Sequence, residues 1–286
     1  MGIGGRIAAQ LSATAVPVDH RTFPDGESYI RLNSDVKGED VAIVQTTAPD
    51  PDRKLMQLLL MAAAATDAGA RSVIAVVPYL AYSRQDRRFL SGEALSLDTV
   101  VRLLEAAGVS ELVVVDVHNE PFLRTIEARH RVRVRNVSAI PLLAEHLKGE
   151  GYGGALSLSP DQGAIHHAEA SARVLGGPSS FFEKSRDRKT GEVTMKAKDL
   201  DISGKRAVVF DDIISSGGTM ALAVAALKTQ GAERVAAACT HALFIGGAEE
   251  KIRKAGADRI LSSDTVETPF SDVTVAGLIA AELRKL

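Results

Sequence analysis

VVFDDIISSGGTM, residues 208–220, is an apolar run that ends in two adjacent carboxylates and is followed by a loop of small hydroxyl and glycine residues. The apolar residues 208–210 predict a buried strand, and residues 220–230 predict a helix. The loop 213–219 then joins the carboxyl end of a strand to the amino end of a helix, which is the edge where open α/β sheets bind their ligands. The stretch therefore predicts an α/β fold with an anion site at this turn.

The loop has the residue types that bind a phosphate group. Backbone N–H groups and the helix dipole favour an anion at the start of a helix. Gly217 and Gly218 allow the backbone to approach closely, and Ser215, Ser216 and Thr219 add hydroxyl donors. Because the Gly-Lys-Ser/Thr of a Walker loop is missing, the loop suits a terminal monophosphate better than a triphosphate that is being cleaved.

Asp211 and Asp212 would repel that phosphate if they faced it. Carboxylates are strong acceptors for vicinal hydroxyl groups, so we expect the pair to bind neutral sugar hydroxyls beside the phosphate, with a cation able to screen their charge. The stretch resembles the binding motif of the type I phosphoribosyltransferase fold, which implies that the loop holds a 5-phosphate and the aspartates hold the ribose 2- and 3-hydroxyls. The alternative is a solvent-exposed turn with an ordinary helix cap.

One layout recurs along the chain: a helix-like segment ends near a glycine, and a short apolar run typical of a buried parallel strand follows. Its copies are AATDAGARSVIAVVPY, RLLEAAGVSELVVVDVH, ALKTQGAERVAAACTH and KIRKAGADRILSSD. Alternating strands and helices imply right-handed βαβ units. We therefore expect two similar type I phosphoribosyltransferase-like domains, each a mostly parallel sheet flanked by helices. The glycine-rich break after LLAEHLK predicts domains over 1–147 and 148–286, with the last helix able to pack back on the first domain.

Composition excludes several classes of protein. The 286 residues include 34 Lys and Arg against 36 Asp and Glu, so no basic field favours nucleic acid. No apolar run reaches the length of a membrane span, and MGIGGRIAAQ lacks the pattern of a signal peptide. Cys239 is the one cysteine, which excludes an internal disulfide. We expect a cytoplasmic protein without a nucleic-acid or membrane partner.

Five further motifs precede residues 208–220. In order they are FPDGE (23–27), PYLAYSRQDRRF (78–89), DVHNE (116–120), SPDQG (159–163) and FFEKSRD (181–187). Together with VVFDDIISSGGTM they resemble the ribose-phosphate pyrophosphokinase family over nearly the whole chain, and the compact length is closer to archaeal members. The resemblance implies that ATP transfers its pyrophosphoryl group to the anomeric hydroxyl of ribose 5-phosphate, giving phosphoribosyl pyrophosphate and AMP, with Mg²⁺ as cofactor.

The resemblance also implies a role for each motif. The residues it assigns are Phe23, Asp25, Glu27, Arg84, Gln85 and Asp86 to ATP; His118 and Asp161 to Mg²⁺; Lys184 and Arg186 to catalysis; and Asp211, Asp212, Ser215, Ser216, Gly217, Gly218 and Thr219 to ribose 5-phosphate. In the family, FPDGE reaches the ATP site of a neighbouring subunit, which implies a homo-oligomer, a dimer or a multiple of dimers.

The chemistry of these side chains agrees with the roles. Arg84 suits phosphate and stacking contacts, and Gln85 suits base or ribose edges. Mg²⁺ prefers oxygen ligands, so for His118 a contact through water or directly to a phosphate stays open. Lys184 and Arg186 alternate in 181–200, a segment expected to be a β-hairpin or a mobile flap, and positive charge on the non-bridging oxygens dominates phosphoryl transfer.

Two other function classes fit parts of the sequence. A non-catalytic regulator could keep the fold and bind phosphoribosyl compounds, but the presence of Lys184, Arg186, His118 and Asp161 favours catalysis. A phosphoribosyltransferase that consumes phosphoribosyl pyrophosphate would not need FPDGE, YSRQDRR or two such domains. The histidines at 166 and 167 depart from the arginine and small residues that many relatives carry there.

Overall fold

The computed structural model describes residues 1–186, 193–197 and 201–286, without the side chains of 184–186 and 193–197. The described chain divides into two compact units, 1–137 with 275–286 and 138–274, called the first and second unit below. Helix α5 (Ile140–Leu147) therefore falls in the second unit and α9 (Ala276–Leu283) in the first. The expected domains, 1–147 and 148–286, place α5 in the first domain and allow the last helix to pack back on it; their bounds remain a prediction.

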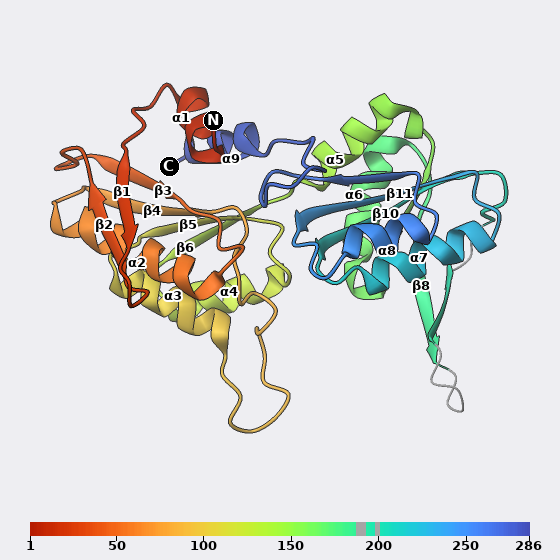
Figure 1. Cartoon of the computed structure of the whole chain (residues 1–286), viewed down its shortest axis with the longest axis horizontal. Coiled ribbons are helices and arrows are strands. Elements are labelled where there is room, and N and C mark those ends of the chain that lie inside the picture. Colours follow the sequence, from red (N-terminus) through yellow and green to blue (C-terminus); the bar gives the residue numbers. More distant parts are fainter. Residues whose placement is uncertain (187–192, 198–200) are drawn as a thin grey trace. The chain divides into compact units, whose positions relative to one another are not determined.

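The first unit is built on a parallel four-stranded sheet of order β3-β4-β5-β6 (Figure 1). The runs SVIAVV and ELVVV form its two central strands because they are apolar after their first residue and are buried over nearly all their length. The strands are β3 (Asp40–Val44), β4 (Ser72–Val77), β5 (Glu111–Val115) and β6 (Arg133–Val137), and the crossover helices are α2 (Pro51–Asp67), α3 (Ser96–Ala106) and α4 (Glu120–Arg129).

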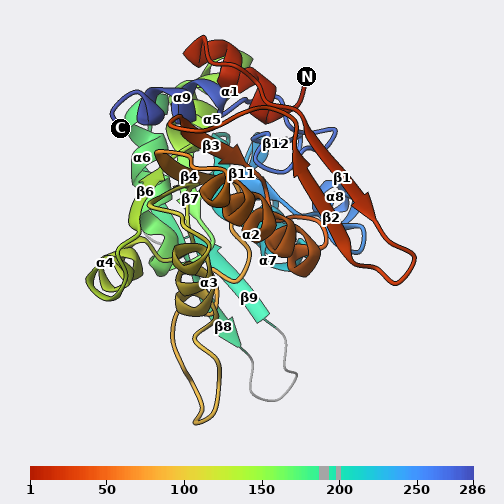
Figure 2. The same cartoon turned by 90° about the vertical axis from the view of Figure 1, so that its left-hand side faces the viewer.

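Both ends of the chain lie in this first unit. The chain begins with helix α1 (Ile3–Leu11) instead of a strand, and α9 returns to lie beside it (Figure 1). An antiparallel ribbon of β1 (Val18–Thr22) and β2 (Ser28–Leu32) follows α1 (Figure 2). The FPDGE motif is the turn at the tip of this ribbon.

The second unit is a six-stranded sheet of order β12-β11-β10-β7-β8-β9, parallel except for β9. Its strands are β7 (Leu156–Ser159), β8 (Ser179–Arg186), β9 (Val193–Ala197), β10 (Arg206–Ile214), β11 (Arg234–Ala242) and β12 (Arg259–Ser262). Its other helices are α6 (Ile165–Leu175), α7 (Gly218–Thr229) and α8 (Ala248–Lys254), with the short η1 (Lys148–Tyr152) and η2 (Gln162–Ala164). The antiparallel pairing of β8 with β9 is the hairpin expected within 181–200, whose residues 187–192 and 198–200 lie outside the described part.

Strand β10 carries apolar side chains to both faces of this sheet. Val209 belongs to the core that α7 and α8 cover, whereas Val208 and Phe210 belong to the core that includes α5. Helices on both faces bury the strand completely over 207–210. The sequence prediction of parallel sheets flanked by helices is confirmed.

The end of β10 corrects one boundary. We expected the loop to cover 213–219, but the strand continues to Ile214 because Ile213 and Ile214 pair with His241 and Ala242 of β11. Helix α7 begins at Gly218, so the connection is only three residues long. In the part of the chain that the structure describes, no helix has the length and apolar character needed to cross a membrane.

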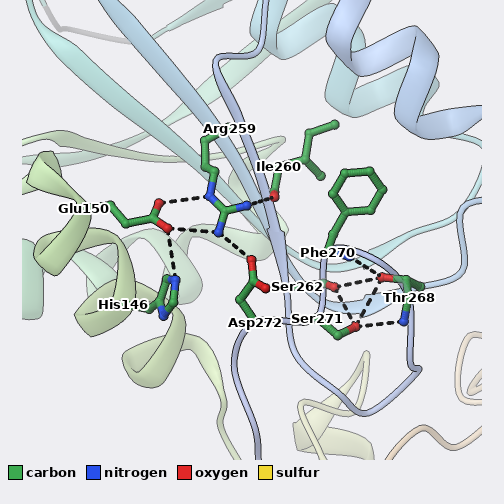
Figure 3. Close-up of polar contacts among 9 residues, drawn as sticks. All are labelled: His146, Glu150, Arg259, Ile260, Ser262, Thr268, Phe270, Ser271 and Asp272. Atoms are coloured by element: carbon green, nitrogen blue, oxygen red, sulfur yellow. Dashed lines mark hydrogen bonds and ion pairs between the residues drawn. The ribbon is translucent and has the colours of Figure 1, made fainter.

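A polar network joins η1 to β12 in the second unit (Figure 3). Arg259 donates to both carboxylate oxygens of Glu150, at 2.9 Å each, and to Asp272 at 2.6 Å. The hydrogen bond from Arg259 keeps the pKa of Glu150 below its ordinary value. His146 Nε2 lies 3.1 Å from the same carboxylate. Because Arg259 of β12 bonds Glu150 of η1 through two hydrogen bonds, we assign the network to holding η1 against β12.

Candidate active site

The second unit brings its sequence-predicted residues to one edge of the sheet. Strand β7 is flanked by β8 on one side and β10 on the other, so the chain changes direction of winding between β7 and β10. Ligands of open α/β sheets bind outside the carboxyl ends of the strands at such a switch point. Asp161 follows β7, and Asp211 and Asp212 lie near the end of β10.

The turn after β10 has the shape that an anion site needs. Gly217 is the N-cap of α7 with φ 74°, and a Cβ there would lie 2.9 Å from both the Cβ and the carbonyl oxygen of Ala248. A Cβ on Gly218 would meet no atom within 4 Å. Packing against α8 therefore requires the first glycine, while the second borders open space at the positive end of the helix.

Neighbouring backbone holds this turn in place. The carbonyl oxygen of Ser215 accepts from the N–H of Ile245 at 2.9 Å, and that of Ser216 accepts from Lys251 Nζ at 3.3 Å. The side chains of Ser216 and Thr219 are exposed. Lys251, which the sequence analysis did not single out, thus places a positive charge beside the predicted phosphate loop.

Asp211 and Asp212 form an electrostatically strained pair. Each carboxylate accepts one backbone hydrogen bond of ordinary length, Asp211 Oδ1 from Asp212 N at 3.0 Å and Asp212 Oδ1 from Ile213 N at 2.9 Å. The pKa of Asp211 is raised well above its ordinary value, first by burial and then by the charge of Asp212 and a hydrogen bond with the Asp212 carboxyl group. The charge of Asp161 raises it further. A ligand that donates hydroxyl hydrogens, or a cation, would relieve this repulsion.

Asp161 is exposed and caps the short helix η2, accepting from Gly163 N at 3.1 Å. Its charge acts on Asp211, so negative charge concentrates at this edge. Within the described ranges, no three His, Cys, Asp or Glu side chains gather in a way that could hold a metal ion. A metal here would take most of its ligands from substrate and water, as Mg²⁺ commonly does.

In the first unit, His118 is exposed on the connection between β5 and α4. The connection starts at the buried Asp116, whose φ is 37° and whose N–H donates to Val137 O at 2.9 Å. Asn136 of β6 accepts from Val117 N at 3.0 Å. The segment that carries the histidine is thus fixed to the neighbouring strand.

The predicted ATP-binding segment follows β4 as a long loop, gold in Figure 1. Arg84 and Gln85 are exposed, whereas Asp86 is buried with only 7% of its surface accessible. Ser96 Oγ donates to the Gln85 side chain, and Asn119 Nδ2 donates to Asp86 Oδ2. Two of the three residues are therefore available to a ligand, and the third is held inward.

The FPDGE turn presents its side chains to solvent. Phe23 is 43% exposed and meets Tyr29 edge to face, with ring centroids 6.3 Å apart. Two hydrogen bonds close the turn: Phe23 N donates to the backbone carbonyl of Glu27 at 2.8 Å, and Glu27 N donates to the side-chain Oδ1 of Asp25 at 3.2 Å. Such an exposed aromatic ring with two carboxylates fits a base-stacking role better than a core-packing one.

Lys184 and Arg186 lie in β8, opposite Met195 and Val193 of β9. Their side chains lie outside the described residues, so their catalytic roles remain predictions.

Known proteins share this arrangement over almost their full length. The ribose-phosphate pyrophosphokinase of Methanothermobacter thermautotrophicus is 41% identical over 278 residues, which are 97% of this chain and 95% of the relative. That of Saccharolobus solfataricus is 40% identical over 273 residues, 95% of this chain and 92% of the relative. The chain belongs to the ribose-phosphate pyrophosphokinase family. The predicted family and its archaeal likeness are confirmed.

The family models and a solved structure agree. The N-terminal domain of ribose phosphate pyrophosphokinase matches residues 2–108, and the phosphoribosyl transferase domain matches 156–274. The crystal structure of phosphoribosylpyrophosphate synthetase from Mycobacterium smegmatis superimposes with a TM-score of 0.86 at 29% identity, over 99% of this chain and 94% of that one. The FPDGE and YSRQDRR motifs fall in the first match, and Asp161 with the phosphate loop falls in the second.

Some residues that contact the predicted site motifs were not foreseen. Lys251 and Asn136 reach the motifs from neighbouring segments, and Asn119 of DVHNE bonds Asp86 of YSRQDRR. Asn119 lies within the DVHNE motif, but its contact with Asp86 had no signal in the sequence. Lys251 and Asn136 had no local signal, because only folding brings them beside Ser216 and Val117.

Proposed function

We propose that the chain transfers the pyrophosphoryl group of ATP to the anomeric hydroxyl of ribose 5-phosphate, producing phosphoribosyl pyrophosphate and AMP, and so supplies a precursor for nucleotide biosynthesis. The observation that carries the proposal is the combination, at one sheet edge, of the open anion-binding turn at Gly218 with the strained carboxylate pair Asp211–Asp212. Near full-length similarity to ribose-phosphate pyrophosphokinases supports this reaction over others of the same fold.

Ribose 5-phosphate binds in the second unit in this proposal. Its phosphate accepts from the first N–H groups of α7 and from the hydroxyls of Ser215, Ser216 and Thr219. Its 2- and 3-hydroxyls donate to Asp211 and Asp212, which relieves the repulsion between the two carboxylates. Phosphate and sugar are thus recognised by successive parts of one turn.

Mg²⁺ fits the donor set that this proposal requires. The carboxylate of Asp161 is an oxygen ligand of the kind that Mg²⁺ prefers, and the negative charge around Asp211 favours a cation. His118 of the first unit would serve the metal in this proposal, through water or on a phosphate. When bound, Mg²⁺ would neutralise part of the negative charge on the ATP phosphates.

ATP is bound by exposed side chains of the first unit. Arg84 pairs with phosphate, Gln85 donates to or accepts from the base or ribose, and Phe23 stacks on adenine with Asp25 and Glu27 at its exocyclic amine. Lys184 and Arg186 stabilise the charge of the transferring group. The ATP site is shared between subunits of a homo-oligomer, because FPDGE serves the neighbouring chain. The enzyme acts in the cytoplasm without nucleic-acid or membrane partners.

The test mixes the protein with ribose 5-phosphate, ATP and Mg²⁺ and follows AMP. We expect AMP and phosphoribosyl pyrophosphate in equal amounts, and neither when ribose 5-phosphate or Mg²⁺ is left out. Asp212→Asn keeps the shape of the site and weakens its acceptor, so it should form much less product at low ribose 5-phosphate. ADP in place of AMP, or no product from a folded protein, would contradict the proposal.

A further inference from the structure

We propose that Asn119 and Asp86 form a positioning pair that fixes the loop carrying Arg84 and Gln85 to the loop carrying His118. This inference rests on the proposed function, in which the exposed side chains of these two loops meet ATP and its metal. It gives Asp86 a different role from its neighbours, because Asp86 acts through Asn119 and not by touching ATP.

Burial separates Asp86 from the two residues before it. Arg84 and Gln85 are exposed, but Asp86 is only 7% accessible. A carboxylate in that position needs a hydrogen-bond donor, because a charged group that is buried without a partner loses its hydration and gains nothing in return. Asn119 Nδ2 donates to Asp86 Oδ2. The carboxylate is therefore turned toward the protein instead of toward a ligand.

Asn119 uses both ends of its amide. While Nδ2 donates to Asp86, Oδ1 accepts from Phe122 N at 3.3 Å as the N-cap of α4. A flipped amide would turn its oxygen toward a carboxylate and its NH₂ toward an N–H donor, so only one orientation satisfies both partners. Alanine provides neither contact, and aspartate would repel Asp86 while still capping the helix.

The pair joins two loops that are anchored separately. The 84–86 segment is tied to α3 by Ser96, whose hydroxyl donates to Gln85. The 116–119 segment is tied to β6 through Asn136 and the N–H of Val117. These loops follow the neighbouring parallel strands β4 and β5, so their bases are set by the sheet. The amide–carboxylate bond then sets the spacing of their outer parts.

Four variants test the pair by exchanging its partners. Asn119→Ala removes the link, Asn119→Asp makes it repulsive, and Asp86→Asn keeps a hydrogen bond without the charge. The double variant Asp86→Asn with Asn119→Asp exchanges amide and carboxylate and restores both the bond and the helix cap. Asn33→Ala, an exposed asparagine elsewhere in the first unit, is the matched control.

The first readout is kinetic. We expect KM for ATP to rise at least about tenfold in Asn119→Ala, which corresponds to about 1.4 kcal/mol of lost binding, and further in Asn119→Asp. The exchanged double variant should return to within about threefold of the parent. KM for ribose 5-phosphate should stay unchanged, since that site lies in the second unit. A double variant as impaired as Asn119→Asp would show that Asp86 touches ATP, and would overturn the inference.

The second readout does not depend on activity. Hydrogen exchange, measured without ligand by mass spectrometry, should speed up in peptides covering 84–97 and 117–123 in Asn119→Ala. Exchange in both peptides should return to the parent rate in the double variant and stay unchanged in Asn33→Ala. Unchanged exchange in Asn119→Ala would overturn the positioning role. If the parent forms no AMP, the proposed function fails on its own, and the exchange rates still decide whether the pair fixes the loops.

Discussion

At the scale of single residues, the two glycines of the phosphate loop have different tasks. Gly217 has φ 74° and no space for a Cβ beside Ala248, whereas Gly218 borders open space. We predict that Gly217→Ala lowers the free energy of unfolding by about 2 kcal/mol or more through its backbone conformation and its clash. Gly218→Ala should leave the stability of the protein unchanged and weaken the binding of ribose 5-phosphate, because the added methyl group enters the predicted anion site.

Thermal unfolding and calorimetry with ribose 5-phosphate separate these effects. Gly177, where a Cβ would lie 2.0 Å from Ala155 O, is a control for a glycine required by packing away from the site. Its alanine variant should lose stability like Gly217→Ala. If Gly218→Ala bound ribose 5-phosphate as tightly as the parent, the phosphate would not lie beside that residue.

Asp211 gives a prediction about pH. Its pKa is raised in the folded protein by burial, by the charge of Asp212 and by the hydrogen bond with its carboxyl. A carboxyl with a raised folded pKa contributes stability that is complete below its unfolded pKa, about 3.9, and is lost as the pH rises through the folded pKa. Asp211→Asn, neutral throughout, should therefore unfold at a higher temperature than the parent at pH 7 and lose this advantage toward pH 4.

Unfolding temperatures of the ligand-free proteins, measured with a chelator between pH 4 and 8, check this. The same variant should bind ribose 5-phosphate more weakly, since the charge that destabilises the empty site is the charge that accepts the sugar hydroxyls. A constant difference in unfolding temperature across this range would show that Asp211 has an ordinary pKa.

The sequence predicted residues whose signal is local and missed those whose role depends on proximity. Ser215 and Gly217 follow an apolar run at a recognisable spacing, so the turn could be predicted. Lys251 lies 35 residues from Ser216 in the chain and reaches it only because α8 packs beside α7. Asn119 and Asp86 are 33 residues apart and meet because their strands are neighbours. Contacts of this kind cannot be inferred from spacing in one sequence.

At the scale of elements, the hydrophobic pattern predicted where strands occur better than it predicted where they end. The apolar residues 208–210 predicted β10, but the strand continues through two carboxylates to Ile214 because β11 is long enough to pair with it. Aspartate disfavours strands on its own, and here the backbone pairing with β11 outweighs that preference. The consequence is functional, since the carboxylates are held on a rigid strand instead of a loop.

The β8–β9 hairpin carries the prediction at this scale. We expect Lys184→Ala and Arg186→Ala each to lower kcat about a hundredfold and to leave the KM values nearly unchanged. A cation that contacts only the transferring group stabilises the transition state and not the bound substrates. Steady-state kinetics with both substrates varied is the measurement. A variant that keeps kcat and raises only KM for ATP would show that the replaced side chain contributes equally to the substrate complex and to the transition state, which would contradict the prediction.

At the scale of the whole molecule, two compact units were predictable because the strand–helix layout occurs in both halves of the sequence. Their limits were harder to infer. The glycines after residue 148 suggested a boundary, whereas α5 packs in the core of the second unit. Helix α9 lies beside α1 in the first unit, an arrangement that the sequence analysis allowed. Glycine marks where a helix ends, whereas packing decides to which unit the helix belongs.

The last prediction concerns the assembly. Glu27 lies at the exposed tip of the β1–β2 ribbon, and in the proposed function it completes the ATP site of a neighbouring subunit, while Lys184 serves its own chain. Glu27→Ala and Lys184→Ala should each be nearly inactive. In a mixed dimer, one site receives both intact residues and the other carries both defects. Random reassortment of equal amounts makes half of the dimers mixed, each with one working site of two, so about a quarter of parent activity should return for a symmetric pair.

The subunits have to be dissociated and re-formed together, because intact oligomers need not exchange chains. Each variant reassorted with itself is the control and should stay inactive. A larger ring of alternating contacts would change the recovered fraction but not the recovery itself. If both variants fold, assemble and are inactive alone, and the reassorted mixture gains no activity, Glu27 and Lys184 serve the same site within one chain. Recovery would instead mean that the exposed FPDGE turn is completed by a second copy, which explains why its aromatic ring and carboxylates face solvent in a single chain.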